Sequence, residues 1–128
     1  GAVGTGTKKM ILINPTDDDL NAAFAEKVAE WKCEMINGAW GGDVDVPAPV
    51  WTSPKGEVST AYFIPKFTHS FDLTLPYLDS VLSSGGFWRI TSNPAGVSCV
   101  INYEQGPIAN TPARAAVIAL LRTHGVEV

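Results

Sequence analysis

Four side chains in this 128-residue chain are of the types that act as nucleophile or base: Cys33, Cys99, His69 and His124. A cysteine–histidine pair works only when the two groups meet in space. Cys99 lies in the middle of a predicted apolar and buried strand face, which it shares with Tyr103, and a free cysteine there behaves as a small hydrophobic residue. Cys33 follows the apolar stripe of a predicted helix, and His124 suits the last turn of another helix, where the dipole favours a cation. We therefore predict no catalytic residue.

Two groups of carboxylates could in principle bind a divalent cation. Asp43 and Asp45 are spaced by one residue, and residues 17–19 are three consecutive aspartates. A metal site needs further ligands, which the sequence does not supply. Helix capping accounts for the triplet and a solvated loop for the pair. We predict no metal and no cofactor, and keep as an alternative a small metal-dependent hydrolase that uses these loop carboxylates and a histidine on a nucleotide or related metabolite.

Aromatic and cationic side chains are the stronger candidates for binding. Trp40 and Trp51 bracket a glycine-rich loop, and Tyr62 lies on the next predicted strand. Such side chains bring a large contact area and lose little rotamer entropy when they bind. Arg89 is placed on a predicted strand, and Arg114 in the first turn of a helix, where a cation indicates an anionic partner. These five residues form the predicted binding set.

Composition and charge restrict the class of protein. Hydrophobic residues make up 45% of the chain and charged ones 17%, which is typical of one soluble globular domain. The net charge is −4 and the basic residues are scattered, so duplex nucleic acid is not an expected partner. No apolar run approaches the ~20 residues of a membrane span. Two distant cysteines are typical of a reduced chain, and we predict a cytoplasmic location.

Turn and capping signals divide the chain into alternating helices and hairpins. Residues 1–9 are small and polar and are predicted to be a tag or a disordered leader, so that residues 10–128 form a single domain. A helix of about four turns is predicted from Thr16 through Trp31, followed by a loop over residues 38–49. Two further helices are expected within residues 67–82 and from Thr111 onward, with strands predicted over residues 50–53, 58–64, 87–91 and 97–103.

The order helix, hairpin, helix, hairpin, helix predicts an α+β fold. Tight turns favour antiparallel pairing, so three helices should pack on a mainly antiparallel sheet of about four to five strands. The pattern leaves open whether the helices cover one face of the sheet or both.

Three stretches of the chain resemble the phage ABA sandwich domain, a family of small phage and prophage proteins. They are residues 20–31, residues 65–70 leading into residues 75–78, and residues 110–122. The resemblance implies a three-layer α/β/α sandwich with helices on both faces of the sheet. The long loop at residues 38–49 departs from the family pattern. The family has no established activity, so no functional residue carries over.

The resemblance implies a phage accessory protein that is expressed in the cytoplasm of a bacterial host cell and acts in host takeover or counter-defence. The expected activity is non-catalytic binding of a host protein or of a small signalling nucleotide. Besides the hydrolase, a structural or assembly role remains an alternative, for which an apolar patch that forms a homodimer would be the expected mark.

Overall fold

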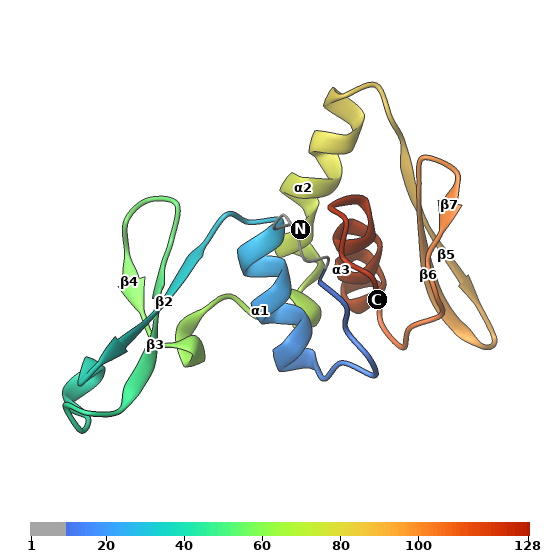
Figure 1. Cartoon of the computed structure of the whole chain (residues 1–128). Coiled ribbons are helices and arrows are strands. Elements are labelled where there is room, and N and C mark those ends of the chain that lie inside the picture. Colours follow the sequence, from blue (N-terminus) through green and yellow to red (C-terminus); the bar gives the residue numbers. More distant parts are fainter. Residues whose placement is uncertain (1–9) are drawn as a thin grey trace, which may run out of the picture.

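The computed structural model describes residues 10–128, and the predicted tag or leader at residues 1–9 lies outside them. Within the described residues, the chain forms three α-helices, three short 3₁₀ turns and two antiparallel sheets of three strands (Figure 1). The helices are α1 (Asp17–Lys27), α2 (Phe71–Ser83) and α3 (Pro112–Thr123), and the turns are η1 (Ala39–Gly41), η2 (Ala61–Phe63) and η3 (Phe67–His69). One sheet contains β2 (Lys32–Asn37), β3 (Pro47–Thr52) and β4 (Val58–Ser59), and the other contains β5 (Trp88–Asn93), β6 (Gly96–Ile101) and β7 (Glu104–Gln105).

Helix α3 is the centre of the hydrophobic core. Its predicted N-terminus is confirmed, because the Thr111 hydroxyl accepts a hydrogen bond of 3.2 Å from the backbone N–H of Arg114 and Pro112 opens the helix. Eight of its twelve residues are buried. Figure 1 shows α3 between the other two helices and the β5–β7 sheet, so every layer of the body packs against it.

Helix α1 begins as predicted and ends earlier. The Thr16 side chain and Asp19 form a reciprocal capping box at its start. The helix ends at Lys27, and Glu30 then adopts a left-handed conformation with φ of 61°. This turn releases the chain into β2, so the predicted fourth turn is wrong. Cys33, predicted at the end of the helical stripe, lies in a strand instead.

Both predicted hairpins are present and antiparallel, yet they belong to separate sheets. The β5–β7 sheet packs its inner face, which includes Cys99 and Ile101, against α3. The β2–β4 sheet projects from the opposite side of the helices (Figure 1). This arrangement corrects the prediction of one four-to-five-strand sheet inside a three-layer α/β/α sandwich. The physical reason is that the turn after α1 directs β2 away from the helices, so the two hairpins never come edge to edge. We call residues 32–59, which comprise β2, β3, β4 and their connections, the arm.

Several strand boundaries differ from the sequence prediction. Strand β3 begins at Pro47, inside the predicted loop, and β4 ends at Ser59, after which η2 replaces the predicted remainder of the strand. Tyr103 was expected on the buried face beside Cys99, but β6 ends at Ile101 and Tyr103 is 89% exposed with φ of 72°. The predicted second helix begins at Phe71 and ends before Gly85, whose positive φ of 85° suits a glycine after a helix.

None of the helices in the described part of the chain has the length and apolar character that a bilayer crossing requires.

Candidate binding surface

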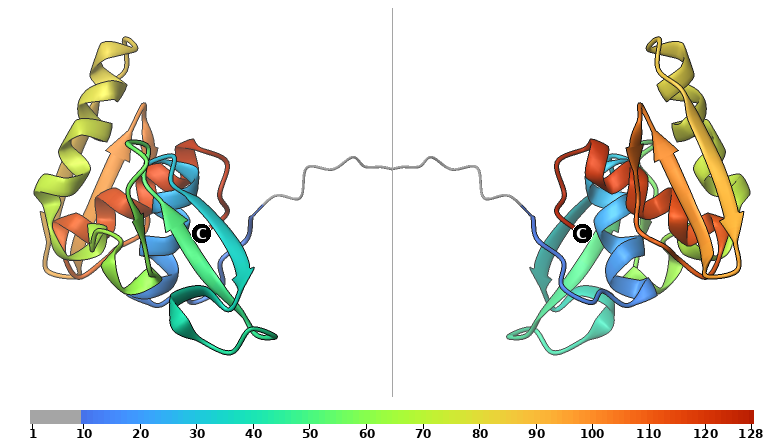
Figure 2. Two further views of the ribbon diagram at one scale, coloured as in Figure 1. Left: turned by 90° about the vertical axis from the view of Figure 1, so that its left-hand side faces the viewer. Right: turned by 90° about the vertical axis from the view of Figure 1, so that its right-hand side faces the viewer.

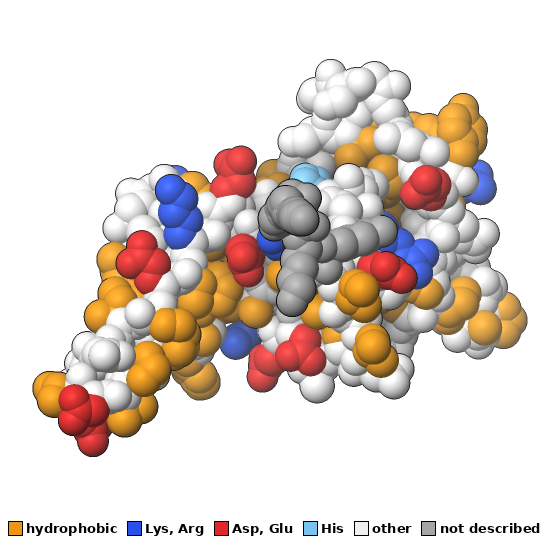
Figure 3. Space-filling view, viewed as in Figure 1, with side chains coloured by type: hydrophobic (Ala, Val, Ile, Leu, Met, Phe, Trp, Pro, Cys, Tyr) orange, Lys and Arg blue, Asp and Glu red, His pale blue; other side chains and the backbone are white. Residues whose placement is uncertain are grey.

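Exposed apolar side chains gather on the arm and on the turn that follows it. Eight of the fourteen large hydrophobic residues that are exposed within residues 10–128 come from this one region of the chain. Figure 3 shows hydrophobic atoms along the arm. Apolar surface of this extent in one place is typical of an interaction site. We call these eight residues the arm surface: Met35, Ile36, Trp40, Val44, Val46, Val58, Tyr62 and Phe63.

The arm surface has two sides because the sheet of the arm is covered on neither face along β2. All six residues of β2 are exposed. Met35 lies opposite Pro49, and Ile36 lies opposite Ala48, so apolar pairs project from alternate faces of the hairpin. The apolar groups therefore do not form the inner face of a core, which is the usual place for such pairs in a sheet.

Trp40 is held in a defined position at the far end of the arm. It lies in η1 with a left-handed φ of 60°, a conformation that costs about 1–3 kcal/mol for a residue other than glycine. Its indole Nε1 donates a hydrogen bond of 3.0 Å to the Pro49 carbonyl. The polar end of the ring is thus satisfied within the arm, and half of the side chain remains exposed. A fixed and half-exposed indole is well suited to anchor a partner.

Tyr62 and Phe63 form a second aromatic group at η2. Their rings pack edge to face with centroids 5.2 Å apart, and both side chains are largely exposed. The Lys66 ammonium lies 5.5 Å from the centroid of the Tyr62 ring. A cavity of about 260 Å³ lies between this turn and α1, and its lining includes Tyr62, Lys66 and Asn21. The aromatic pair therefore extends the arm surface toward the helical body.

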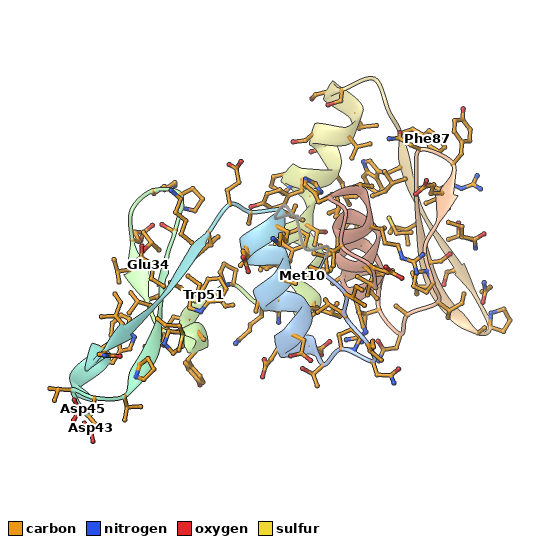
Figure 4. The ribbon with its side chains drawn as sticks, in the orientation of Figure 1. Met10, Glu34, Asp43, Asp45, Trp51 and Phe87 are labelled. Atoms are coloured by element: carbon orange, nitrogen blue, oxygen red, sulfur yellow. The ribbon has the colours of Figure 1, made fainter. Side chains whose placement is uncertain are left out.

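The predicted binding residues do not form one site. Trp40 and Tyr62 belong to the arm surface, but Trp51 is only 6% exposed and joins the hydrophobic core. Figure 4 shows Trp51 on the side of the arm nearest the helices. Arg89 is exposed on β5, in the other sheet. The predicted binding roles of Trp51 and Arg89 stay predictions, at positions remote from the arm surface.

Arg114 has an intramolecular anionic partner. Its guanidinium pairs with the Asp17 carboxylate and donates a second hydrogen bond of 3.0 Å to the Pro15 carbonyl. His69 Nε2 lies 3.5 Å from the other carboxylate oxygen of Asp17. These contacts connect η3 and the N-termini of α1 and α3. Asp17 thus gives Arg114 an anionic partner within the chain, and the predicted binding role of Arg114 stays a prediction.

The candidate catalytic and metal-binding groups are dispersed. Cys99 is buried, Cys33 is exposed on the arm, and His124 Nδ1 lies 2.9 Å from the Leu120 carbonyl. Asp43 and Asp45 lie at the tip of the arm (Figure 4), where the Asp45 backbone N–H donates to the Asp43 carboxylate. Within residues 10–128, no three His, Cys, Asp or Glu side chains are grouped to hold a metal ion.

The two cysteines should differ sharply in reactivity. Burial raises the pKa of the Cys99 thiol to about 11, whereas the pKa of the exposed Cys33 is raised first by partial desolvation and then by the Glu26 carboxylate. Because the thiolate is the reactive form, iodoacetamide at pH 8 should add one group to the native protein and two in denaturant. Mass spectrometry of the intact chain and its peptides measures this. Native labelling of Cys99 at the rate of Cys33 would contradict the buried position of β6.

Six members of the arm surface were missed by sequence reasoning, because only Trp40 and Tyr62 were in the predicted binding set. Met35 and Ile36 follow a segment that was predicted to be helical, so their exposure on a strand was not foreseen. Val58 and Phe63 were assigned to a longer strand without a preferred face. The alternation of valine and aspartate over residues 43–46 was the one available signal that apolar side chains were being placed in a solvated turn. No family model, curated protein or solved structure matches this chain.

Proposed function

We propose that this protein works by binding a protein partner, and that the arm surface is where the partner docks. The observation that carries the proposal is the gathering of eight large exposed apolar side chains on the arm and on the turn that follows it. Burying such surface is favourable by roughly 25 cal/mol per Å². Trp40 and the Tyr62–Phe63 pair are of the residue types that dominate binding energy at protein interfaces.

The shape of the arm favours a protein over a small molecule. Small ligands bind in concave sites that cover most of their surface. The arm projects from the body (Figure 1), and the pairing of β2 with β3 places its apolar groups on both faces of a hairpin. A partner that forms a groove or clamp around the arm would cover both faces, whereas a nucleotide would leave most of the apolar groups in water.

The charges at the tip of the arm suggest which charged residues border the apolar surface of the partner. Asp43 and Asp45 are exposed on either side of Val44. Complementary charge at the rim of an interface speeds association and fixes orientation. We therefore propose an apolar partner surface with basic residues where it meets the tip of the arm. The setting implied by the phage ABA sandwich resemblance, host takeover or counter-defence, stays a prediction of the sequence.

The test is affinity capture from bacterial lysate followed by titration with the purified partner. Trp40→Ser combined with Phe63→Ser removes two anchors from the arm surface, and Tyr103→Ser removes a still more exposed ring from the turn between β6 and β7. The first variant should bind the purified partner at least about 100-fold more weakly, while Tyr103→Ser should bind like the parent. Equal binding by all three proteins would contradict docking on the arm.

A further inference from the structure

The outer edge of β2 carries hydrogen-bonding groups that the hairpin does not use. The Gly38 N–H donates a hydrogen bond of 3.1 Å to the Val46 carbonyl, next to the end of the β2–β3 ladder. Hydrogen-bonded and non-hydrogen-bonded pairs alternate along an antiparallel ladder, so this bond identifies which residues of β2 bond to β3. The even-numbered residues of β2 bond to β3, so the N–H and C=O groups of Cys33, Met35 and Asn37 point the other way. No hydrogen bond from elsewhere in residues 10–128 reaches them. Figure 2 shows β2 as the outer strand of the arm.

The opposite edge of the hairpin is protected against pairing. Pro47 and Pro49 occupy outward positions of β3 and have no N–H to offer, and the Trp40 indole covers the Pro49 carbonyl. The end of β3 is paired with β4. Prolines and covering groups are the usual means of preventing edge-to-edge association. The edge formed by β2 has neither, so the arm is protected on one side and open on the other.

We propose that β2 pairs antiparallel with β2 of a second copy of this chain, which joins two arms into one six-stranded sheet. The proposal goes beyond the partner docking described above and does not depend on it. With the two-fold axis at Met35, Met35 faces Met35 of the second copy, and Cys33 faces its Asn37. All three outward residues of each strand are then used, in three pairs of two hydrogen bonds each.

The distribution of charge favours this register. An antiparallel pair places the acidic tip of each arm beside the base of the other, so Asp43 and Asp45 approach Lys32 of the second copy. Moving the axis by one residue to Glu34 would set two glutamates directly opposite each other. That register would also need the Trp31 N–H, which already donates to the Ala25 carbonyl. Charge and hydrogen bonding therefore favour the axis at Met35 over the axis at Glu34.

A closed dimer suits this edge better than open-ended association of many copies. Pairing of β2 with itself is isologous, and the protected opposite edge prevents further addition, so association closes at a dimer. The other long free edge, that of β5, offers less apolar gain, because Trp88 and Ile90 already pack against the core. On β2, by contrast, Met35 and Ile36 are exposed and would be brought beside their counterparts.

The first test is sedimentation velocity over a range of protein concentrations. Met35→Pro removes the outward N–H without touching the β2–β3 ladder, and Met35→Thr replaces the side chain but keeps that N–H. Ser92→Pro removes an outward N–H from the free edge of β5. The parent, Met35→Thr and Ser92→Pro should dimerise, and Met35→Pro should dimerise at least about 100-fold more weakly. A monomeric parent at all concentrations, or a dimer that Met35→Pro leaves intact, would overturn the proposal.

The second test does not depend on how well the proline variant folds. In Asn37→Cys, the new thiol lies opposite Cys33 of the second copy, about 5.5 Å away between Cα atoms. A short bismaleimide should convert this variant to a covalent dimer and leave the parent monomeric in denaturing gels. Failure of Asn37→Cys to cross-link, or equal cross-linking of the parent, would overturn this register. Titration of Met35→Pro with the purified partner measures docking independently of dimerisation. Loss of the dimer and loss of partner binding are therefore distinguished.

Discussion

Replacing Phe24 with alanine is expected to lower the free energy of unfolding by about 3–5 kcal/mol. Phe24 is fully buried in α1, and its ring centroid lies 4.4 Å from that of Phe67 and 5.2 Å from that of Tyr77. Truncation removes apolar contacts and leaves a cavity where α1, η3 and α2 meet. Urea unfolding followed by circular dichroism measures the loss.

Phe63→Ala is the matched control for this change. It deletes the same ring from a side chain that is 69% exposed, so the free energy of unfolding should change by no more than about 0.5 kcal/mol. Similar losses for the two variants would mean that the helices do not pack around Phe24 as described. The contrast also shows whether the arm surface can be altered without weakening the fold, as the docking experiment requires.

Replacing Trp51 with alanine is expected to free the arm while the helical body stays folded. Trp51 is the one buried residue among the strands of the arm, and it joins the core cluster. Its loss should remove about 3 kcal/mol of local stability, which corresponds to about 100-fold faster amide exchange in residues 32–59. Hydrogen exchange followed by mass spectrometry should show unchanged protection in α3.

Val58→Ala tests whether that effect is specific to the anchor. Val58 lies in the same sheet, but its side chain is exposed, so exchange in the arm should remain close to that of the parent. If Trp51→Ala speeds exchange equally in the arm and in α3, the arm is not a separate cooperative unit. If it speeds exchange in neither, the contact of Trp51 with the core does not hold the arm.

Local signals predicted the parts of the fold that depend on local chemistry. The Thr111–Pro112 start of α3 and the capping box of α1 are properties of a few adjacent residues, and both are confirmed. The turn before Gly96 predicted the second hairpin in the same way. By contrast, the spacing of Phe24, Val28 and Trp31 suits a helix, although the chain leaves the helix at Lys27 and still buries or half-buries all three side chains.

Sheet pairing could not be predicted, because a hairpin pattern does not say which other hairpin lies beside it. The separation of the two sheets follows from the left-handed turn at Glu30, a residue type with no special preference for that conformation. The same limit affected the binding residues. Trp40 and Trp51 bracket the same predicted loop, but one is half exposed at the tip of the arm and the other is buried at its base.

The central claim, docking of a protein partner on the arm, is tested most directly by site-specific photocrosslinking in the cell. A benzoylphenylalanine at Trp40 places the reactive group on the arm surface, and one at Tyr103 places it at an exposed position in the turn between β6 and β7. We predict that position 40 yields one discrete cross-linked protein that position 103 does not yield. Cross-linking of the same partner from position 103, with none from position 40, would contradict the account.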